Sequence, residues 1–280
     1  MEFLHHVDRA LRAYLQFRGA QVRWFEGSLG RMHLYDIPGK SGAPTLVLLH
    51  GIGAGATHFW PLMLRLRHHF GRILAPDHLG HGFSDDLVDP TPEGVFAAMA
   101  EALDAELTEP AVVFGNSMGG AFALQYALVR PEKVRTLLLC SPAGAPMNRA
   151  EFTEFLLTFD LSSRQKAVDF VGRLYTRPPW FAGLIAPGVA RIFARPWMRA
   201  FIATFRSEHL LNAEILATLR VPTVVWWGRA ERIMPAGALS FWKEHLPNVE
   251  EPDGFGHCPQ LDHPRRLAAA IVAAALPHGK

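Results

Sequence analysis

The sequence predicts an α/β fold with a doubly wound, mostly parallel sheet and an inserted helical cap. Three observations support this class. Short apolar, β-branched runs alternate with helical patterns from residue 45 onward, as in parallel strands buried on both faces. Two alternating stretches ahead of them flank a short turn, and the strand pattern stops between 145 and 215. A chain of 280 residues is long enough for one such domain with an insertion.

Five apolar runs have the length and composition of buried strands. They are TLVLLH (45–50), RILAPD (72–77), AVVFGNS (111–117), VRTLLLCS (134–141) and VPTVVWWG (221–228). The helical patterns between and after them cover 57–69, 92–108, 118–129, 236–246 and 264–276. QVRWFEG and GRMHLYDIPG precede the first run and alternate around a Gly-Ser-Leu-Gly turn, which predicts an antiparallel hairpin at the sheet edge.

The predicted core comprises residues 1–144 and 216–280, and the predicted cap comprises 145–215, inserted after the sixth strand. The aromatic side chains of the cap either line an apolar substrate pocket or pack the cap onto the body, and helical spacing fits both roles. The pocket candidates are Phe152, Phe155, Trp180 and Trp197. Three arginines of the cap lie four residues apart, which predicts that they share one face of a helix. They are Arg191, Arg195 and Arg199. That face either is exposed to solvent or meets an anionic substrate.

Apolar residues recur at helical spacing near the N-terminus, at Phe3, Leu4, Val7, Leu11 and Leu15. The pattern over residues 1–17 predicts an amphipathic helix that packs on the body of the protein or associates with a membrane surface. No apolar run approaches the roughly 20 residues that span a bilayer, and the first residues lack the cleavage site of a secretory signal. We therefore expect no stable membrane span.

Composition argues against several classes of partner. A formal net charge of +2 is too small to indicate nucleic-acid binding. Cys140 and Cys258 lack the spacing of a zinc site or a disulfide framework. His78 and His81 lack the carboxylate partners that would complete a metal site. We expect a reduced, cytoplasmic protein without a metal or cofactor.

The stretch AVVFGNSMGGAFALQYAL, residues 111–128, gives the strongest functional signal. An apolar run leads to Ser117, which Gly115 and Gly119 frame, and a helical pattern follows. Such a turn lifts a serine hydroxyl out of the sheet, and its glycines let strand and helix approach closely. The pattern predicts a nucleophilic serine, although a plain strand-to-helix turn can also hold this residue.

A serine nucleophile needs a base, and the base needs an acid to orient it. His257 lies in a glycine-rich loop before the last predicted helix, where it can reach Ser117. Glu231 follows the strand at 221–228 and gives the chain order serine, acid, histidine. Asp253 and Asp262 are the alternative acids.

The attacked carbonyl oxygen becomes an anion, so two backbone N–H groups must point at it. We expect one from Met118, at the start of the helix after the serine. The other is expected from Ile52, in the glycine-rich loop HGIGAG after the strand at 45–50.

The same loop also fits a different class of protein. Gly51, Gly53 and Ala56 match part of a dinucleotide-binding fingerprint. Asp77 ends the next predicted strand, and its separation in sequence from these glycines is about that of the acid that binds the ribose in such proteins. That alternative, an NAD(P)-dependent oxidoreductase, leaves the serine, acid and histidine unexplained. A non-catalytic binding protein on the same fold is a second alternative.

Together these motifs resemble the α/β-hydrolase superfamily. The matching segments follow the order of the family and run along essentially the whole chain, with the cap as the variable part. They are HGIGAG (50–55), PDHLGHGFS (76–84), GNSMGG (115–120), WGRAERIMP (227–235) and GHCPQLDHP (256–264). Family members usually carry aspartate where this chain has Glu231.

The resemblance implies a serine hydrolase that needs no cofactor. Serine at this turn, where similar dehalogenases and epoxide hydrolases use aspartate, implies acyl transfer through an acyl-enzyme. We expect a carboxylesterase or lipase-like enzyme for small-molecule esters of short to medium apolar acyl chains. GNSMGG and SPAG are also similar to carbon–carbon bond hydrolases of aromatic degradation, which usually carry tryptophan where this chain has Cys258. Such a hydrolase is the alternative within the family.

Overall fold

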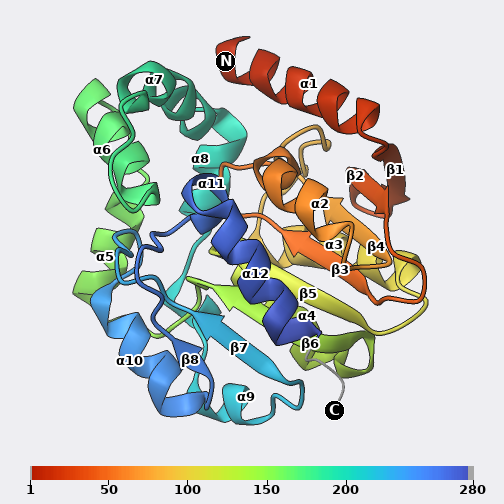
Figure 1. Ribbon diagram of the computed structural model, residues 1–280. Helices are drawn as coiled ribbons and strands as arrows, with labels where there is room; N and C mark the ends of the chain where they lie inside the picture. The colour runs from red at the N-terminus through yellow and green to blue at the C-terminus, as the bar shows by residue number, and fades with distance from the viewer. Residues whose placement is uncertain (1, 277–280) are drawn as a thin grey trace.

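The computed structural model describes residues 2–276, which form one eight-stranded sheet flanked by helices (Figure 1). The strand order is β1-β2-β4-β3-β5-β6-β7-β8; β2 runs antiparallel to both neighbours and the other pairs are parallel. The predicted fold class is therefore confirmed. The strands are Gln21–Gly27 (β1), Gly30–Pro38 (β2), Thr45–Leu49 (β3), Arg72–Pro76 (β4), Ala111–Asn116 (β5), Val134–Cys140 (β6), Thr223–Trp226 (β7) and Val249–Glu250 (β8).

Both faces of the sheet are buried, which explains why its strands read as continuous apolar runs. In β3, Leu46 and Leu48 join the core on one face, whereas Val47 and Leu49 join the core on the other. The first core includes residues of α2 (Trp60–Leu66) and α12 (Pro264–Ala275). The second includes residues of α3 (Pro92–Glu106), α4 (Met118–Val129) and α10 (Ala236–His245). Short helical turns, η1 (Ala56–Phe59), η2 (Pro131–Lys133) and α11 (Pro259–Asp262), complete the body.

Four of the helices between β6 and β7 form a separate layer beside the sheet (Figure 1). They are α5 (Arg149–Leu157), α6 (Arg164–Leu174), α7 (Ala182–Phe193) and α8 (Pro196–Ala203). The chain then returns to the body through η3 (Ser207–His209) and α9 (Ala213–Ala217), and α9 contacts α10. Asn148 starts α5 with a capping box, because its side chain accepts the N–H of Glu151 and the Glu151 carboxylate accepts the N–H of Asn148. The predicted boundary at 215/216 falls inside α9.

The cap arginines do not form one helical stripe, so that prediction is wrong. Pro196 disfavours helical backbone at the residue before it, and Arg195 has ψ 138° and separates α7 from α8. The Arg195 guanidinium instead donates to both carboxylate oxygens of Asp86, at 2.6 and 2.9 Å. Arg191 and Arg199 lie on different helices, one on each side of this break.

The N-terminal helix α1 (Glu2–Phe17) lies along the edge of the body and contacts α7 (Figure 1). Leu15 is fully buried, and Leu4 lies against Gly188 of α7. Phe3 and Val7 remain 48% and 38% exposed, so the predicted apolar stripe is only partly covered. Association of this outer face with a membrane surface stays a prediction. No helix within residues 2–276 is long and apolar enough to cross a membrane.

Candidate active site

Ser117 occupies a strained turn between β5 and α4. Its φ of 58° and ψ of −120° lie where side chains rarely occur, as expected at a strand-to-helix turn that lifts a serine out of a sheet. The two framing glycines are required by close packing. A Cβ on Gly115 would lie 2.2 Å from the carbonyl oxygen of Gly119, and a Cβ on Gly119 would lie 2.2 Å from that of Leu49. Any larger residue at either position would displace backbone.

Glu231 and His257 form a buried pair. His257 Nδ1 lies 2.8 Å from Glu231 Oε2, and their side chains are only 4% and 3% exposed. The other oxygen, Oε1, accepts the backbone N–H groups of Ile233 and Met234 at 2.6 and 3.0 Å. Burial raises the pKa of the Glu231 carboxyl, but the charge and hydrogen bond of His257, together with the Ser141 hydroxyl and the hydrogen bond from the N–H of Met234, outweigh burial and lower this pKa to about 2.

This lowered pKa predicts a pH-dependent contribution to stability. Because the folded-state pKa lies below the value of 4.5 for a free glutamate, the stabilisation is complete above pH 4.5 and disappears as the pH falls toward 2. A difference of this size corresponds to about 3 kcal/mol. Urea unfolding at several pH values should show that the free energy of unfolding falls more steeply in the wild type than in Glu231→Gln. Parallel curves would show that the carboxylate is not stabilised in this way.

The alternative acids are engaged elsewhere. The Asp253 side chain is 79% exposed and pairs with Arg229 at 3.1 Å. Asp262 accepts the backbone N–H of Thr176 at 2.7 Å. Neither carboxylate is hydrogen-bonded to His257, so among these three acids only Glu231 contacts the imidazole in this way.

Asn116 links the serine turn to the histidine loop, a role that the sequence analysis missed. Its amide Nδ2 donates to the carbonyl oxygens of His257 and Cys140, at 2.8 and 3.0 Å, and its Oδ1 accepts from Gln260 at 2.8 Å. The residue before Ser117 therefore binds the backbone of residue 257 directly. Within residues 2–276, the Ser117 hydroxyl itself forms no hydrogen bond to His257; such contacts often tighten only when substrate is bound.

The histidine loop is also bound to the end of α6. The N–H of Cys258 donates to the carbonyl oxygen of Leu174 at 2.9 Å. The Thr176 hydroxyl donates to the carbonyl oxygen of Gly254 at 2.6 Å, in addition to the bond between its N–H and Asp262. These bonds hold one end of α6 against the loop that carries the histidine.

The two predicted oxyanion donors lie beside Ser117. The backbone N–H groups of Ile52 and Met118 donate to no acceptor in the described part of the chain, and both residues line the same cavity as Ser117. A Cβ on Gly51 would lie 3.2 Å from the Cβ of Ser117, so the loop before Ile52 packs closely on the serine. Two unpaired donors at this position are what an oxyanion requires.

Comparison with known proteins shows the family of this chain. A model of the alpha/beta hydrolase family matches residues 46–270. The chain belongs to the alpha/beta hydrolase family. A pimeloyl-[acyl-carrier protein] methyl ester esterase of Xanthomonas campestris pv. campestris is 33% identical over 274 residues, covering 88% of this chain and all of that protein.

Solved structures show the same fold at low sequence identity. The crystal structure of a membrane phospholipase A has a TM-score of 0.80 and 20% identity, covering 96% of this chain and 92% of that one. The structure of 2-hydroxy-6-oxo-6-phenylhexa-2,4-dienoate hydrolase from Rhodococcus sp. strain RHA1 has a TM-score of 0.76 and 23% identity, covering 91% and 98%. At these identities the likeness concerns the fold of this alpha/beta hydrolase.

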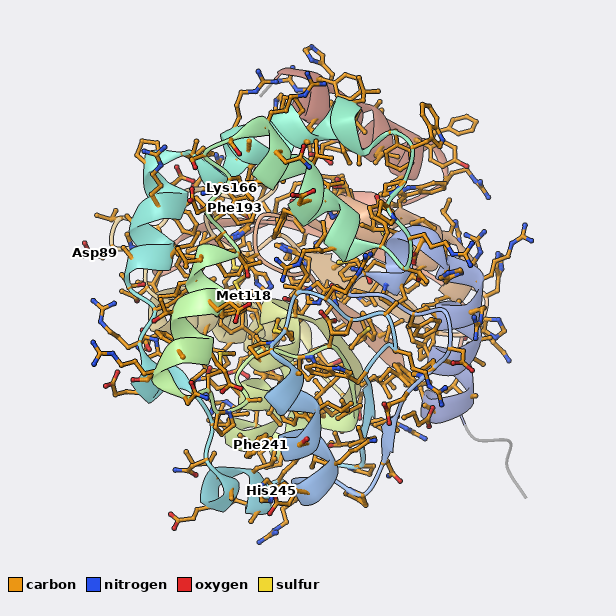
Figure 2. The ribbon with its side chains drawn as sticks, turned by 90° about the vertical axis from the view of Figure 1, so that its left-hand side faces the viewer. Asp89, Met118, Lys166, Phe193, Phe241 and His245 are labelled. Carbon is orange, nitrogen blue, oxygen red and sulfur yellow. The ribbon has the colours of Figure 1, made fainter. Side chains whose placement is uncertain are left out.

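The cavity of this hydrolase opens from Ser117 toward the cap. It has a volume of about 390 Å³ and is lined mainly by apolar side chains. The cap and neighbouring segments contribute Phe152, Phe155, Phe159, Phe201 and Phe205, and the polar lining residues include Glu93, Arg206 and His209. Met118 and Phe193 are buried and are drawn toward the middle of the view in Figure 2, whereas Asp89 and His245 lie near its outline. Apolar walls with a few polar groups are typical of small-molecule sites.

Two of the four predicted pocket aromatics lie outside this cavity. Trp180 is 92% exposed, because it falls in the loop before α7 rather than on an inward helix face. Trp197 is buried against Gly80, and its indole N–H donates to the carbonyl oxygen of Leu87 at 2.9 Å, so it packs the cap onto the body. Phe152 and Phe155 line the cavity as predicted.

The dinucleotide-binding alternative is also contradicted by the structure. Asp77 is fully buried, and its oxygens accept the N–H groups of Ala56 at 2.6 Å and Phe83 at 3.0 Å, while His33 lies 3.0 Å away. A carboxylate occupied in this way cannot bind a ribose. It instead ties the loop that carries Ile52 to the loop after β4.

Proposed function

We propose that this protein is a serine carboxylesterase or lipase-like hydrolase. The observation that carries the proposal is the 2.8 Å bond between Glu231 and His257, in a loop that Asn116 ties to the turn at Ser117. The apolar cavity that Ser117 lines gives an ester substrate access to the serine. The esterase name of a relative that is 33% identical supports the same class.

The proposed reaction follows from the roles of these groups. His257 accepts the proton of the Ser117 hydroxyl as the serine oxygen attacks the ester carbonyl, and Glu231 stabilises the imidazolium that forms. The N–H groups of Ile52 and Met118 hold the oxyanion. His257 then returns the proton to the leaving alcohol, and a water that it activates releases the acid from the acyl-enzyme.

Ester chain length tests the proposed pocket. We expect the highest kcat/KM for nitrophenyl butyrate or octanoate and lower values for the acetate and palmitate, because aromatic side chains bound the cavity. Phe155→Ala should shift the preference toward longer chains, and Trp180→Ala, which removes an exposed ring, should leave it unchanged. Equal rates for charged and apolar acyl groups would contradict an apolar acyl pocket.

A carbon–carbon bond hydrolase is the second candidate. The observation that favours it is Arg206, a cation in the cavity wall that an anionic dienoate substrate could approach. Its guanidinium already donates to the carbonyl oxygens of Ala203 and Phe205, at 2.6 and 2.8 Å, which leaves fewer of its donors for a ligand. A ring-cleavage dienoate added to the ester series distinguishes the two activities, because turnover of the dienoate but of no ester would replace the esterase proposal.

A further inference from the structure

A second groove lies in the cap outside the cavity at Ser117. It has a volume of about 580 Å³ and lies between the α5–α6 connection and the break between α7 and α8. Leu156, Phe159, Leu161 and Ile202 contribute apolar surface, and Arg191 and Arg199 are its two arginines. Neither the catalytic proposal nor the family match accounts for this groove.

The two arginines have no partner of their own. Within residues 2–276, neither Arg191 nor Arg199 forms an ion pair or a side-chain hydrogen bond, whereas Arg195 between them pairs with Asp86. Asp160, the acidic residue that lines the groove, is bound to Lys166 at 2.5 Å and to the N–H of Ser162 at 3.1 Å. The groove therefore presents two uncompensated cations beside an apolar surface.

The groove and the catalytic cavity share a wall. Phe159 lines both spaces, and its ring stacks on Phe193 with centroids 5.8 Å apart and planes within 6°. Phe193 in turn reaches the oxyanion loop, because a Cβ on Gly53 would lie 2.7 Å from its ring. A chain bound in the groove would therefore contact an aromatic pair that borders the site of reaction.

We propose that this groove binds a long-chain carboxylate. The guanidinium groups of Arg191 and Arg199 hold the carboxylate, since planar guanidinium forks match its two oxygens. The alkyl chain lies against Leu156, Phe159 and Ile202. The volume falls within the range of pockets that hold single small molecules, and a concave groove suits one chain better than the flat surface of a bilayer does. The binding site does not depend on which reaction the serine performs.

Calorimetry of dodecanoate binding tests whether Arg191 and Arg199 hold the carboxylate. The titration is kept below the concentration at which dodecanoate forms micelles. We expect the double variant Arg191→Gln/Arg199→Gln to bind at least about tenfold more weakly than the wild type, because charge-assisted hydrogen bonds are lost. Arg135→Gln, which removes an exposed arginine of β6, is the matched control and should bind as the wild type does. Dodecanol should bind the wild type more weakly than dodecanoate does.

Photo-crosslinking separates this groove from the cavity at Ser117. A long-chain fatty acid with a diazirine in its chain should label peptides within 190–203 in the wild type and lose that labelling in the double variant. Labelling confined to 117–128 and 205–215 would place the ligand in the catalytic cavity and overturn the proposal. Absence of dodecanoate binding, equal affinity of the double variant, or equal affinity for dodecanol would overturn it as well.

Discussion

Replacing Ser117 with alanine should abolish ester hydrolysis while leaving the fold intact. The hydroxyl is the proposed nucleophile, and in serine hydrolases with a triad its loss costs about 10⁶-fold in kcat. The cavity walls and the N–H groups of Ile52 and Met118 stay in place, so a non-hydrolysable ester analogue should still bind. Steady-state kinetics with nitrophenyl butyrate measure the loss of hydrolysis. Thermal unfolding of the wild type and the variant tests whether the fold is intact.

A covalent label provides the control for this prediction. A fluorophosphonate should modify the wild-type enzyme on the peptide that contains Ser117, and it should not modify the alanine variant. Ser162→Ala, which changes an exposed serine of the cap, should keep full activity and full labelling. Absence of ester turnover and of labelling in the wild type would favour a non-catalytic binding protein on this fold, and turnover that survives in Ser117→Ala would show that another group is the nucleophile.

Glu231→Gln should lower kcat by about 10⁴-fold, the cost found when the acid of a serine triad becomes an amide. In the proposed mechanism the Glu231 carboxylate accepts the Nδ1–H of His257 through the 2.8 Å bond and stabilises the imidazolium that forms during the reaction. A glutamine can donate its own N–H to Nδ1 and so favours the wrong tautomer. Nitrophenyl butyrate turnover across a range of pH measures the loss.

Asp253→Asn is the matched control, because it removes an exposed carboxylate nearby in the sequence that contacts Arg229 instead of His257. It should leave kcat close to the wild-type value. Glu231→Asp keeps the charge but is one methylene shorter, so we expect activity between those of the wild type and Glu231→Gln. Near-normal turnover in Glu231→Gln would show that another group orients the base.

Local rules made the fold predictable from the sequence. Continuous apolar runs predicted strands that are buried on both faces, and β3 shows this directly, with alternate side chains in the two cores. Glycines at 115 and 119 marked the crowded turn, since each packs against backbone at a distance that admits no Cβ. The pairing of Glu231 with His257 was also expected, because loops that follow parallel strands meet at one edge of the sheet.

Contacts between distant segments were harder to predict. Asn116 lies 141 residues from its acceptor at His257, and no spacing rule connects such a pair. Trp180 and Trp197 share the aromatic character of pocket residues, but their positions depend on where the cap helices begin and end. The arginine spacing suggested one helix, and the effect of Pro196 on Arg195 was overlooked.

The bonds between α6 and the histidine loop limit how this enzyme can admit a bulky substrate. Cys258 and Asp262 hold the residues at 174 and 176, so that end of the cap moves only if the loop that carries His257, the proposed general base, moves with it. A lid motion that preserves catalysis would therefore pivot about the C-terminal end of α6. Entry of a bulky substrate would then require α5, α7 and α8 to move away from the body while the C-terminal end of α6 stays in place.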